Sequence, residues 1–379
     1  DLIVEICEQM VDFLGVEVKE KGPQVYEAKE LFSKITNDVI GTCAFGIKVD
    51  SLRDQDNYFT TKTKKFLNVF EKAPLTKVMF FRLFSKIIDI FNISFFDKEC
   101  SEFLKRIIIN TMKVREEKNI IRPDMIHLLM EAQKGNLKHT ATDNDPLNTT
   151  GFATAKESTI GLSAPKRTWS EDEIVAQCFF FFVAGFDSTS TVLSFAIYEL
   201  MVNPDIQDKL FDELSEANVN LGGKPLKYDT LLNLKYLDMV VSEILRKWPP
   251  GSIVHRICNR DFTLKYDGKE YTFRKGDVFW IPIASIHRNP EFYTDPDKYD
   301  PERFSDDNKH LINPSSYIPF GTGPRNCLGS RFALMELKAI LYYLILNFRL
   351  EVTQKTQIPL ELKKCMFGVV PEKGIHVSF

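Results

Sequence analysis

The strongest chemical signal in the chain is a single cysteine in a glycine-rich stretch near the carboxyl end. Residues 320–329 read Phe-Gly-Thr-Gly-Pro-Arg-Asn-Cys-Leu-Gly, and a long apolar helix pattern follows them. A cysteine at a helix start lies among backbone N–H groups and the positive end of the helix dipole, which together stabilise a thiolate. A thiolate is a strong axial ligand for haem iron, because it pushes electron density toward the metal and favours O–O cleavage. Cys327 is therefore the predicted ligand of a haem iron.

The neighbours of Cys327 fit this role. Gly321 and Gly323 would bend the loop, and Gly329 would let the following helix approach closely, because glycine adopts backbone conformations that other residues avoid. Phe320 would cover the sulfur and keep water away from it. The alternative interpretation is a buried free cysteine at a helix start, which is common for isolated cysteines.

A second group of chemically active residues lies midway along a long predicted helix. Residues 184–189 read Ala-Gly-Phe-Asp-Ser-Thr. Positions i, i+3 and i+4 share a helix face, so Ala184, Asp187 and Ser188 are expected to project together. The small residue would leave room for a flat cofactor, and Gly185 would allow a local widening where a water inserts. The acid and the alcohol could then pass protons to iron-bound oxygen. The alternative is a helix kink with a buried polar pair.

Two further patterns concern charge. Glu243 and Arg246 stand at i and i+3, which places both on one helix face. Taken alone this pair is a weak signal, because surface helices hold many such pairs and an exposed one adds little stability. Arg256 follows His255, and arginine offers the bidentate geometry that suits haem propionates. His255 and His287 are expected to pack or to bond locally rather than to bind iron.

Taken together, these residues resemble the cytochrome P-450 family of haem-thiolate monooxygenases. Residues 320–329 fill every fixed position of the family's haem-binding pattern, Phe-x-x-Gly-x-Arg-x-Cys-x-Gly, and residues 243–246 match its Glu-x-x-Arg pattern. Residues 184–189 match its Ala/Gly-Gly-x-Asp/Glu-Thr pattern, except that Ser188 stands where threonine is usual. Serine keeps the hydroxyl but lacks the methyl group that stiffens χ1. We therefore expect oxygen activation to survive, with the coupling efficiency in question.

The resemblance implies a role for each matching residue. Asp187 and Ser188 would be the catalytic proton relay. Arg303 would close a buried triad with Glu243 and Arg246, which would hold the segment before the cysteine loop. The cofactor would be haem b. Its binding residues would be Arg325 and Arg256 at the propionates, Cys327 at the iron as its axial ligand, and Phe320, Gly321, Gly329 and Ala184.

The resemblance also implies the fold and the reaction. A single catalytic domain is expected over residues 1–379, mainly α with a small β part, which is the cytochrome P-450 fold. The expected reaction inserts one oxygen atom from O2 into apolar small molecules, either foreign compounds or endogenous lipid-like ones. The long helix and the cysteine loop most resemble insect microsomal members that oxidise foreign compounds.

Electrons are expected from a separate protein, because no flavin or nicotinamide fingerprint follows a strand in the sequence. The resemblance implies NADPH–cytochrome P-450 reductase as the donor, with cytochrome b5 as a second one. Lys247, Arg331 and Lys338 are interpreted either as a basic docking patch for the reductase or as a solvated helix face. Residues 179–182 and Phe186 are predicted to supply apolar pocket wall, although some of them must face the core.

Two other functions stay open at this point. One is a haem-thiolate isomerase or dehydratase that rearranges peroxides without O2. The other is a non-catalytic haem-binding protein. The pair Asp187 and Ser188 argues against the first, because rearrangement needs no proton relay, and more weakly against the second.

The composition of the chain bears on its expected binding partners and on its cellular compartment. The net charge of -3 is the small difference between 49 basic and 52 acidic residues, which gives no electrostatic case for a nucleic-acid partner. The seven scattered cysteines form no Cys-x-x-Cys pair, which favours a reducing compartment. The chain begins at Asp1, without the family's anchor or its Trp-x-x-x-Arg helix. We interpret it as an N-terminally truncated fragment of a protein on the cytoplasmic face of the endoplasmic reticulum membrane.

The rest of the pattern is helical with a few strands. Ser170 and Glu173 form a capping box, which starts the long helix that runs to near Met201. Residues 78–96 are apolar with interspersed cations, and are either a patch that contacts the membrane surface or ordinary core helices. Predicted helices also span 1–20, 28–45, 56–72 and 98–118, another starts at Asn203-Pro204, another ends at Trp248, and the last runs from near Cys327 to near Asn347; a hairpin spans 262–273, a strand 278–282 and a solvated loop 136–167.

Overall fold

The computed structural model describes residues 2–54, 57–63, 98–122, 124–135, 152, 169–363 and 368–379. Its helices are α1 (Leu2–Lys21), α2 (Ala28–Phe45), α6 (Lys98–Lys118), α7 (Met125–Gln133), α8 (Glu171–Val202), α9 (Pro204–Leu221), α10 (Tyr228–Asn233), α11 (Lys235–Lys247), α12 (Ile283–His287) and α13 (Ser330–Asn347). Its strands are β1 (Val25–Glu27), β2 (Val254–Ile257), β3 (Phe262–Tyr266), β4 (Lys269–Phe273), β5 (Val278–Ile281) and β6 (His376–Ser378). Short 3₁₀ helices span Pro301–Phe304, Lys309–Leu311 and Gly323–Arg325.

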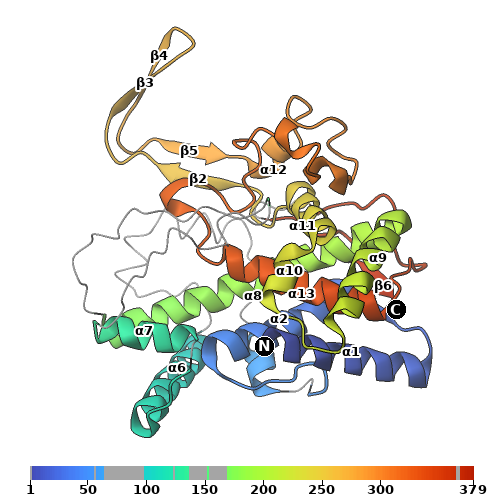
Figure 1. Ribbon diagram of the computed structural model, residues 1–379. Coiled ribbons are helices and arrows are strands. Elements are labelled where there is room, and N and C mark those ends of the chain that lie inside the picture. The colour runs from blue at the N-terminus through green and yellow to red at the C-terminus, as the bar shows by residue number, and fades with distance from the viewer. Residues whose placement is uncertain are drawn as a thin grey trace.

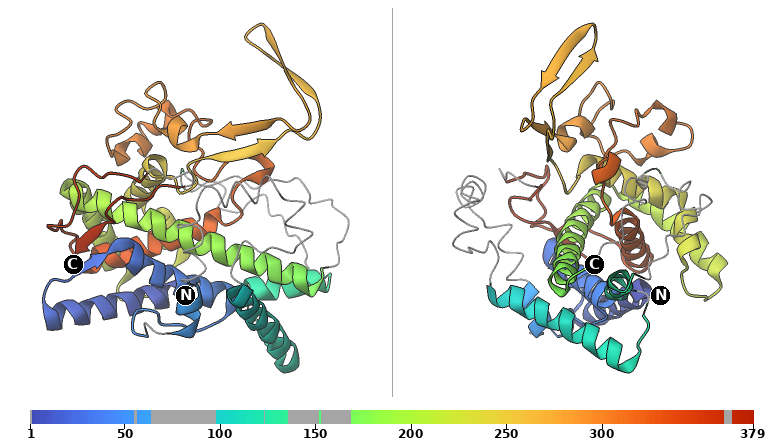
Figure 2. Two further views of the ribbon diagram at one scale, coloured as in Figure 1. Left: turned by 180° about the vertical axis from the view of Figure 1, so that it is seen from behind. Right: turned by 90° about the vertical axis from the view of Figure 1, so that its left-hand side faces the viewer.

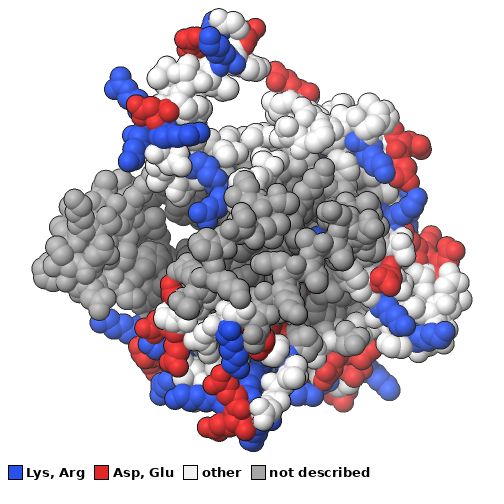
Figure 3. All heavy atoms as spheres, turned by 60° about the vertical axis from the view of Figure 1, so that its left-hand side comes forward, with Lys and Arg blue, Asp and Glu red and all other residues white. Residues whose placement is uncertain are grey.

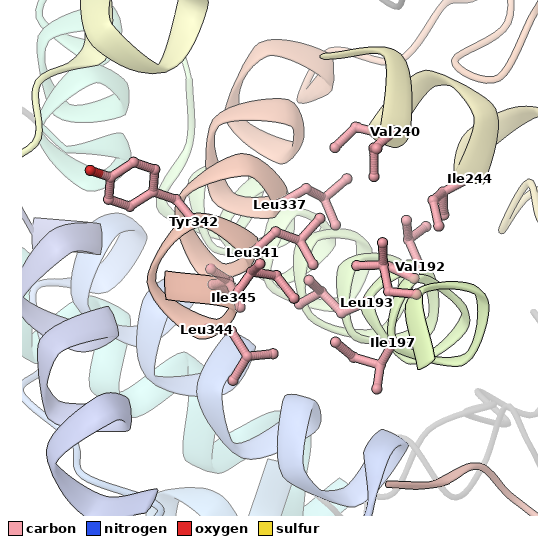
Figure 4. Close-up of a cluster of buried hydrophobic side chains, with 14 of the residues drawn as sticks. Val192, Leu193, Ile197, Val240, Ile244, Leu337, Leu341, Tyr342, Leu344 and Ile345 are labelled. Atoms are coloured by element: carbon pink, nitrogen blue, oxygen red, sulfur yellow. The ribbon is translucent and has the colours of Figure 1, made fainter. Parts of the chain in front are cut away.

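Helix α8 runs through the helical part of the molecule (Figures 1 and 2). In its second half, from Val192 to Met201, every residue is buried. A helix that is apolar all round needs neighbours on all sides, and α2, α11 and α13 pack against it. Figure 4 shows this junction, where Val192, Leu193 and Ile197 of α8 meet Val240 and Ile244 of α11 and Leu337, Leu341, Leu344 and Ile345 of α13.

Within the described part of the chain, α8 is also the one helix whose length and composition would allow it to cross a membrane. The most apolar 18-residue window of this helix is 56% buried inside the molecule. A core helix of a folded domain shows the same combination of length and burial. We therefore attribute the apolar character of α8 to packing inside the protein.

The β part is built from antiparallel strand pairs, β1 with β6, β2 with β5, and β3 with β4. A turn at Asp267 and Gly268 joins β3 to β4, and both residues have positive φ, 50° and 70°. Two-residue hairpin turns favour such residues, because their twist then matches that of the strands. This hairpin projects from the body of the molecule, as Figure 1 shows.

The structure confirms the mainly α fold with a small β part and most of the predicted elements. α1, α2 and α6 match the helices predicted at 1–20, 28–45 and 98–118, and the hairpin lies where it was predicted. The capping box of Ser170 and Glu173 is present in both directions. Residues 58–63 are helical, whereas the rest of the helix predicted to end at residue 72, the apolar stretch 78–96 and almost all of the loop 136–167 lie outside the described residues.

One predicted boundary is confirmed and one was wrong. α9 begins at Pro204 as predicted, although the Asn203 side chain does not cap it; the Asn203 amide donates instead to the carbonyl of Glu199 over 2.8 Å, at the end of α8. α13 begins at Ser330 rather than near Cys327. The backbone N–H of Cys327 bonds instead across the loop, to the carbonyl of Phe320.

The described surface carries both signs of charge. On the face in Figure 3, basic and acidic side chains are interspersed rather than gathered into one field. This agrees with the near balance of 49 basic and 52 acidic residues. The long-range steering that a one-sided charge would provide is therefore not expected from this face.

Candidate haem site

The loop that carries Cys327 closes on itself through backbone hydrogen bonds. The Cys327 N–H donates to the carbonyl of Phe320 over 2.8 Å, and the Gly321 N–H donates to the carbonyl of Ile318 over 3.0 Å. Gly321 and Gly323 have φ values of 70° and 75°, which residues with a Cβ rarely adopt. The two glycines thus turn the loop as predicted, and they leave Cys327 exposed to solvent.

The environment of the thiol differs in part from the sequence prediction. Partial desolvation raises the pKa of the Cys327 thiol above its ordinary value, and a hydrogen bond from the backbone of Gly329 acts in the opposite direction. Gly329 is the N-cap residue of α13, which begins at Ser330. Coordination of iron would itself deprotonate the sulfur. A Cβ at Gly329 would meet no described protein atom within 4 Å.

The two predicted propionate partners lie together beside this loop. Arg256 Nη2 donates to the carbonyl of Arg325 over 3.4 Å, which links β2 to the cysteine loop. Arg256 Nη1 also donates to the carbonyl of His255 over 2.9 Å. The His255 ring lies 5.5 Å from the ring of Trp280 on the paired strand β5. His255 therefore packs locally, as predicted, and the Arg256 guanidinium lies against the backbone of the cysteine loop.

Glu243, Arg246 and Arg303 come together as the resemblance implied. Arg246 donates to both carboxylate oxygens of Glu243, with Nε–Oε2 and Nη2–Oε1 distances of 2.6 and 2.8 Å. Arg303 Nε donates to Glu243 Oε1 over 3.4 Å, and the N–H of Asp300 donates to the same oxygen over 2.9 Å. Burial raises the pKa of Glu243, and the hydrogen bonds from Arg246 act in the opposite direction. The carboxylate thus joins α11 to the 3₁₀ helix Pro301–Phe304.

On α8, the predicted acid and alcohol point to different neighbours. Ser188 lies on the same face as Ala184, and its Oγ donates to the carbonyl of Ala184 over 2.6 Å. Asp187 turns toward α2, where Lys29 Nζ donates to its Oδ1 over 2.7 Å. The shared face predicted for three residues therefore holds for Ala184 and Ser188. Asp187 stands at the edge between that face and α2.

Sequence reasoning missed Lys29. Its Nζ also donates to the carbonyl of Asp187 and to the hydroxyls of Ser190 and Thr191, at distances of 2.7 to 2.9 Å. This ammonium group therefore fixes one turn of α8 next to Ser188. The contact joins positions 158 residues apart, so no local pattern in the sequence signals it.

Gly185 has a different role from the predicted one. A Cβ at this position would lie 2.9 Å from Cδ1 of Ile40 on α2. Glycine therefore allows α2 and α8 to approach each other closely. The predicted local widening of the helix is not seen, because α8 is a continuous α-helix from Glu171 to Val202.

A buried carboxyl group, Glu336 of α13, lies near α8. Glu336 is 1% exposed, and neither of its carboxyl oxygens has a hydrogen-bond partner within normal geometry among the described residues. Burial raises the pKa of Glu336 well above its ordinary value, and the nearby Thr189 hydroxyl opposes this only in part. A buried carboxylate without a cation is costly, so this environment favours the neutral carboxyl form of Glu336. The sequence signal was available, because Glu336 is the one acid in residues 330–347.

Substitution of Glu336 by glutamine is expected to remove a pH dependence of stability. A carboxyl whose folded-state pKa is raised contributes stability that is full below its unfolded pKa and is lost as the pH rises toward the folded value. The melting temperature of the natural protein should therefore fall between pH 5 and pH 8 more steeply than that of Glu336→Gln. The corresponding loss in the free energy of unfolding is at most about 1.4 kcal/mol per pH unit. The exposed Glu216 on α9 provides the matched control, Glu216→Gln. Equal pH slopes in all three proteins would contradict the assignment.

The predicted basic docking patch is wrong for two of its three residues. Lys247 is paired with Glu199 over 2.8 Å, and its side chain is 13% exposed. Lys338 is paired with Asp238 over 2.7 Å, and its side chain is 5% exposed. Both cations are held inside the fold by acids from neighbouring helices. They are therefore not free to meet a partner protein.

The phenylalanine-rich segment of α8 divides between core and surface. Phe182 and Phe186 are buried at 0% and 3% exposure, and their rings stack 5.9 Å apart. Phe182 also meets Phe45 of α2 edge-on. Phe180 is 62% exposed. The prediction that some of these rings face the core is confirmed by Phe182 and Phe186, and the partly buried Phe179 packs against the same core cluster.

These side chains fit an iron porphyrin with two propionates. Such a group needs an axial ligand and cationic partners for its carboxylates. The site offers the accessible thiol of Cys327, with Arg325 on the same loop and Arg256 bonded to the backbone of that loop. α13 follows the thiol loop and packs on α8, the helix that presents Ala184 and Ser188. The fold and the site together define a class of protein, the mainly helical haem-thiolate enzymes.

The comparisons with known proteins identify the family. The family model for cytochrome P450 matches residues 1–379, and the chain belongs to this family. Relatives include probable cytochrome P450 9f2 of Drosophila melanogaster, 39% identical over 377 residues, and cytochrome P450 9e2 of Blattella germanica, 42% identical over 367 residues. Cytochrome P450 6k1 of Blattella germanica is 35% identical over 379 residues.

These alignments cover 100%, 96% and 100% of this chain but only 69%, 65% and 69% of the respective relatives. The chain thus corresponds to part of each relative's length. Cytochromes P450 are haem-thiolate monooxygenases, and family membership assigns the chain to that class of enzyme. The predicted resemblance to insect members of the family is confirmed.

Proposed function

We propose that the full-length protein inserts one atom of O2 into apolar small molecules, with haem b as its cofactor and residues 1–379 as its single catalytic domain. Electrons come from NADPH through a separate NADPH–cytochrome P-450 reductase, with cytochrome b5 as a second donor. The enzyme works at the surface of the endoplasmic reticulum membrane, on its cytoplasmic face. The observation that carries this proposal is the closed loop that presents Cys327 beside Arg256 and Arg325.

Each side chain has a defined task in this proposal. Cys327 binds the iron as a thiolate, and Arg256 and Arg325 neutralise the propionates. When bound, the haem supplies the activation of O2. Ser188 presents a hydroxyl that now donates to the carbonyl of Ala184, 2.6 Å away, and can hold or hand on a proton. Asp187 connects that turn of α8 to Lys29 and to solvent, because its side chain is 41% exposed.

The proposed substrate class is apolar, as the exposed aromatic and small residues of α8 suggest. Phe180 is exposed on this helix, and Ala184, one turn further along, leaves space on the same side. Foreign compounds and endogenous lipid-like molecules both belong to this class. The insect relatives support the assignment through family membership alone, because their names specify no substrate.

The full-length protein with purified reductase and NADPH tests this function. Labelled oxygen gas should appear as one atom in an apolar product, and omission of NADPH or O2 should abolish it. Product formation from a lipid hydroperoxide without O2 and NADPH would favour the rearranging enzyme instead. An intact thiolate-type spectrum without any turnover over a broad substrate panel would favour a haem-binding protein.

The same assay includes the Ser188 series. Ser188→Ala is expected to divert about half or more of the reducing equivalents to peroxide, because the hydroxyl that passes protons is lost. A few-fold change in the ratio of the two competing rates corresponds to only about 1 kcal/mol in activation free energy. Ser188→Thr should hold or improve coupling, since the added methyl group stiffens χ1. Peroxide per NADPH is the measured quantity. Equal yields in all three proteins would make the Ser188 hydroxyl irrelevant to coupling.

A further inference from the structure

His287 occupies a junction that the family patterns leave unexplained. It is the last residue of α12 and is 0% exposed. Its Nδ1 lies 3.1 Å from the carbonyl oxygen of Arg246, and its Nε2 lies 2.9 Å from the backbone nitrogen of Ile318. Its ring stacks on that of Tyr317, with centroids 5.6 Å apart and planes 17° apart. Both ring nitrogens and one ring face are therefore engaged.

The hydrogen-bond partners assign the tautomer of His287. The Ile318 N–H is only a donor, so Nε2 must accept and carry no proton. The Arg246 carbonyl is only an acceptor, so Nδ1 must carry the proton and donate. The ring is thus neutral, in agreement with burial, which lowers the pKa of His287 to about 4.

His287 and Arg246 hold each other through two hydrogen bonds in opposite directions. The ring of His287 donates to the carbonyl of Arg246, and Arg246 Nη1 donates to the carbonyl of His287 over 2.8 Å. Arg246 is also the residue that binds the Glu243 carboxylate, through its Nε and Nη2 donors. The position of the His287 ring is therefore fixed by the buried ion pair.

The other end of this connection is the cysteine loop. Ile318, whose N–H is held by His287, accepts at its carbonyl the N–H of Gly321 over 3.0 Å. Two residues after Ile318, Phe320 accepts at its carbonyl the N–H of Cys327 over 2.8 Å. The hydrogen bond from Ile318 to His287 is therefore the anchor at the point where the loop leaves the core.

We propose that His287 is a positioning residue, which transmits the rigidity of the Glu243–Arg246 ion pair to the loop and thereby sets the orientation of the Cys327 sulfur. This inference rests on the proposed role of Cys327 as the haem ligand. Its structural part, the anchoring of the loop at Ile318, is independent of that role and can be measured separately.

Two substitutions separate the two hydrogen bonds of the ring. In His287→Asn the side-chain amide takes the place of Nδ1, so the donor to Arg246 is kept and the acceptor for Ile318 is lost. In His287→Gln the longer side chain takes the place of Nε2, so the acceptor for Ile318 is kept and the donor is lost. The hypothesis predicts that only His287→Asn releases the loop.

Tyr317→Phe is the matched control. The Tyr317 hydroxyl donates to the carbonyl of Ser242 on α11 over 3.0 Å, so its removal also breaks one buried hydrogen bond between the same segment and α11. The phenylalanine ring keeps the stacking against His287. The Ile318 amide keeps its partner. This variant therefore has a comparable cost in stability without the predicted effect on the loop.

The first measurement is hydrogen exchange of the full-length holoprotein, followed in peptides that span 312–327. His287→Asn should exchange about tenfold faster there than the natural protein, because the partly buried N–H of Ile318 has lost its acceptor. His287→Gln and Tyr317→Phe should stay within about twofold of the natural protein in the same peptides. The second measurement is the fraction of the carbon monoxide complex without thiolate ligation, which should rise several-fold in His287→Asn only.

The outcomes discriminate between the hypotheses. Equal loop exchange in His287→Asn and His287→Gln, or an equal effect of Tyr317→Phe, would overturn the positioning role in favour of plain core packing. Faster exchange in His287→Asn with no spectral change would overturn the link to the sulfur. If the asparagine variant does not accumulate, near-natural exchange and spectrum in His287→Gln support the proposal, and a change beyond that of Tyr317→Phe contradicts it. A natural protein with no thiolate spectrum would instead refute the proposed function.

Discussion

Replacement of Arg246 by methionine is expected to prevent recovery of folded, haem-containing protein. Arg246 and Glu243 are both fully buried, and Arg246 supplies two of the hydrogen bonds that satisfy the Glu243 carboxylate. Removal of one partner of a buried pair leaves an uncompensated charge, which costs about 3–5 kcal/mol. That loss is a large part of the roughly 5–15 kcal/mol by which folded proteins are stable. Soluble yield and the ratio of haem to protein are the measured quantities.

Lys235 and Asp306 offer the matched control for this substitution. They form a pair 2.8 Å long whose side chains are 79% and 61% exposed. Exposed pairs contribute about 0–1 kcal/mol, so Lys235→Met should leave the yield and the haem content unchanged. The double variant Glu243→Leu with Arg246→Met should recover part of the loss, because the fully buried carboxylate is then removed together with its fully buried partner. Natural yield and haem content in Arg246→Met alone would show that the pair is dispensable.

Replacement of Cys327 by alanine is expected to abolish oxygen insertion. The sulfur is the one axial ligand that the closed loop presents, and without it the push of electron density toward the iron is lost. We expect NADPH-dependent product formation to fall by at least about a thousandfold, which corresponds to roughly 4 kcal/mol in the activation barrier. Product per enzyme per minute, with saturating reductase, is the measurement.

Cys258 provides the control for a general effect of cysteine loss. It is buried next to β2, and its Sγ donates to the carbonyl of Arg260 over 2.8 Å. Cys258→Ser keeps a small side chain that can donate the same hydrogen bond, so activity should stay within about twofold, less than 0.5 kcal/mol. Retained activity in Cys327→Ala, or an equal loss in Cys258→Ser, would contradict the assignment of Cys327.

The sequence predicted those features that depend on neighbours in the chain. Ser170 and Glu173 form their capping box within one turn, and the turn at Asp267 and Gly268 needs residues that tolerate positive φ. The loop before α13 also follows from its own glycines. Local propensity decides such features, so the residues within each segment suffice to predict them.

The features that sequence reasoning missed depend on tertiary contacts. Lys29 lies on a helix that is distant from Asp187 in the sequence but pairs with it in the fold, and His287 bonds to both Arg246 and Ile318. A single histidine or lysine carries no pattern that names its partner. The structure therefore adds the contacts of Lys29 and His287 around the candidate site, whereas the sequence motif already pointed to Cys327.

Burial was the second source of error. Lys247 was predicted at the surface because its charge favours solvent, yet Glu199 accepts its ammonium group inside the fold. Lys338 is held by Asp238 in the same way. A cation in an amphipathic pattern can be buried whenever another helix supplies an acid, and that helix is known only from the fold.

The central claim is that Cys327 is the thiolate ligand of the haem iron, and a carbon monoxide difference spectrum of the reduced full-length protein tests it most directly. The natural protein and Cys258→Ser should both show the red-shifted Soret band of thiolate ligation. Cys327→His should bind haem and show the band of imidazole ligation instead. A thiolate-type band that persists unchanged in Cys327→His would contradict the account, because another residue would then hold the iron.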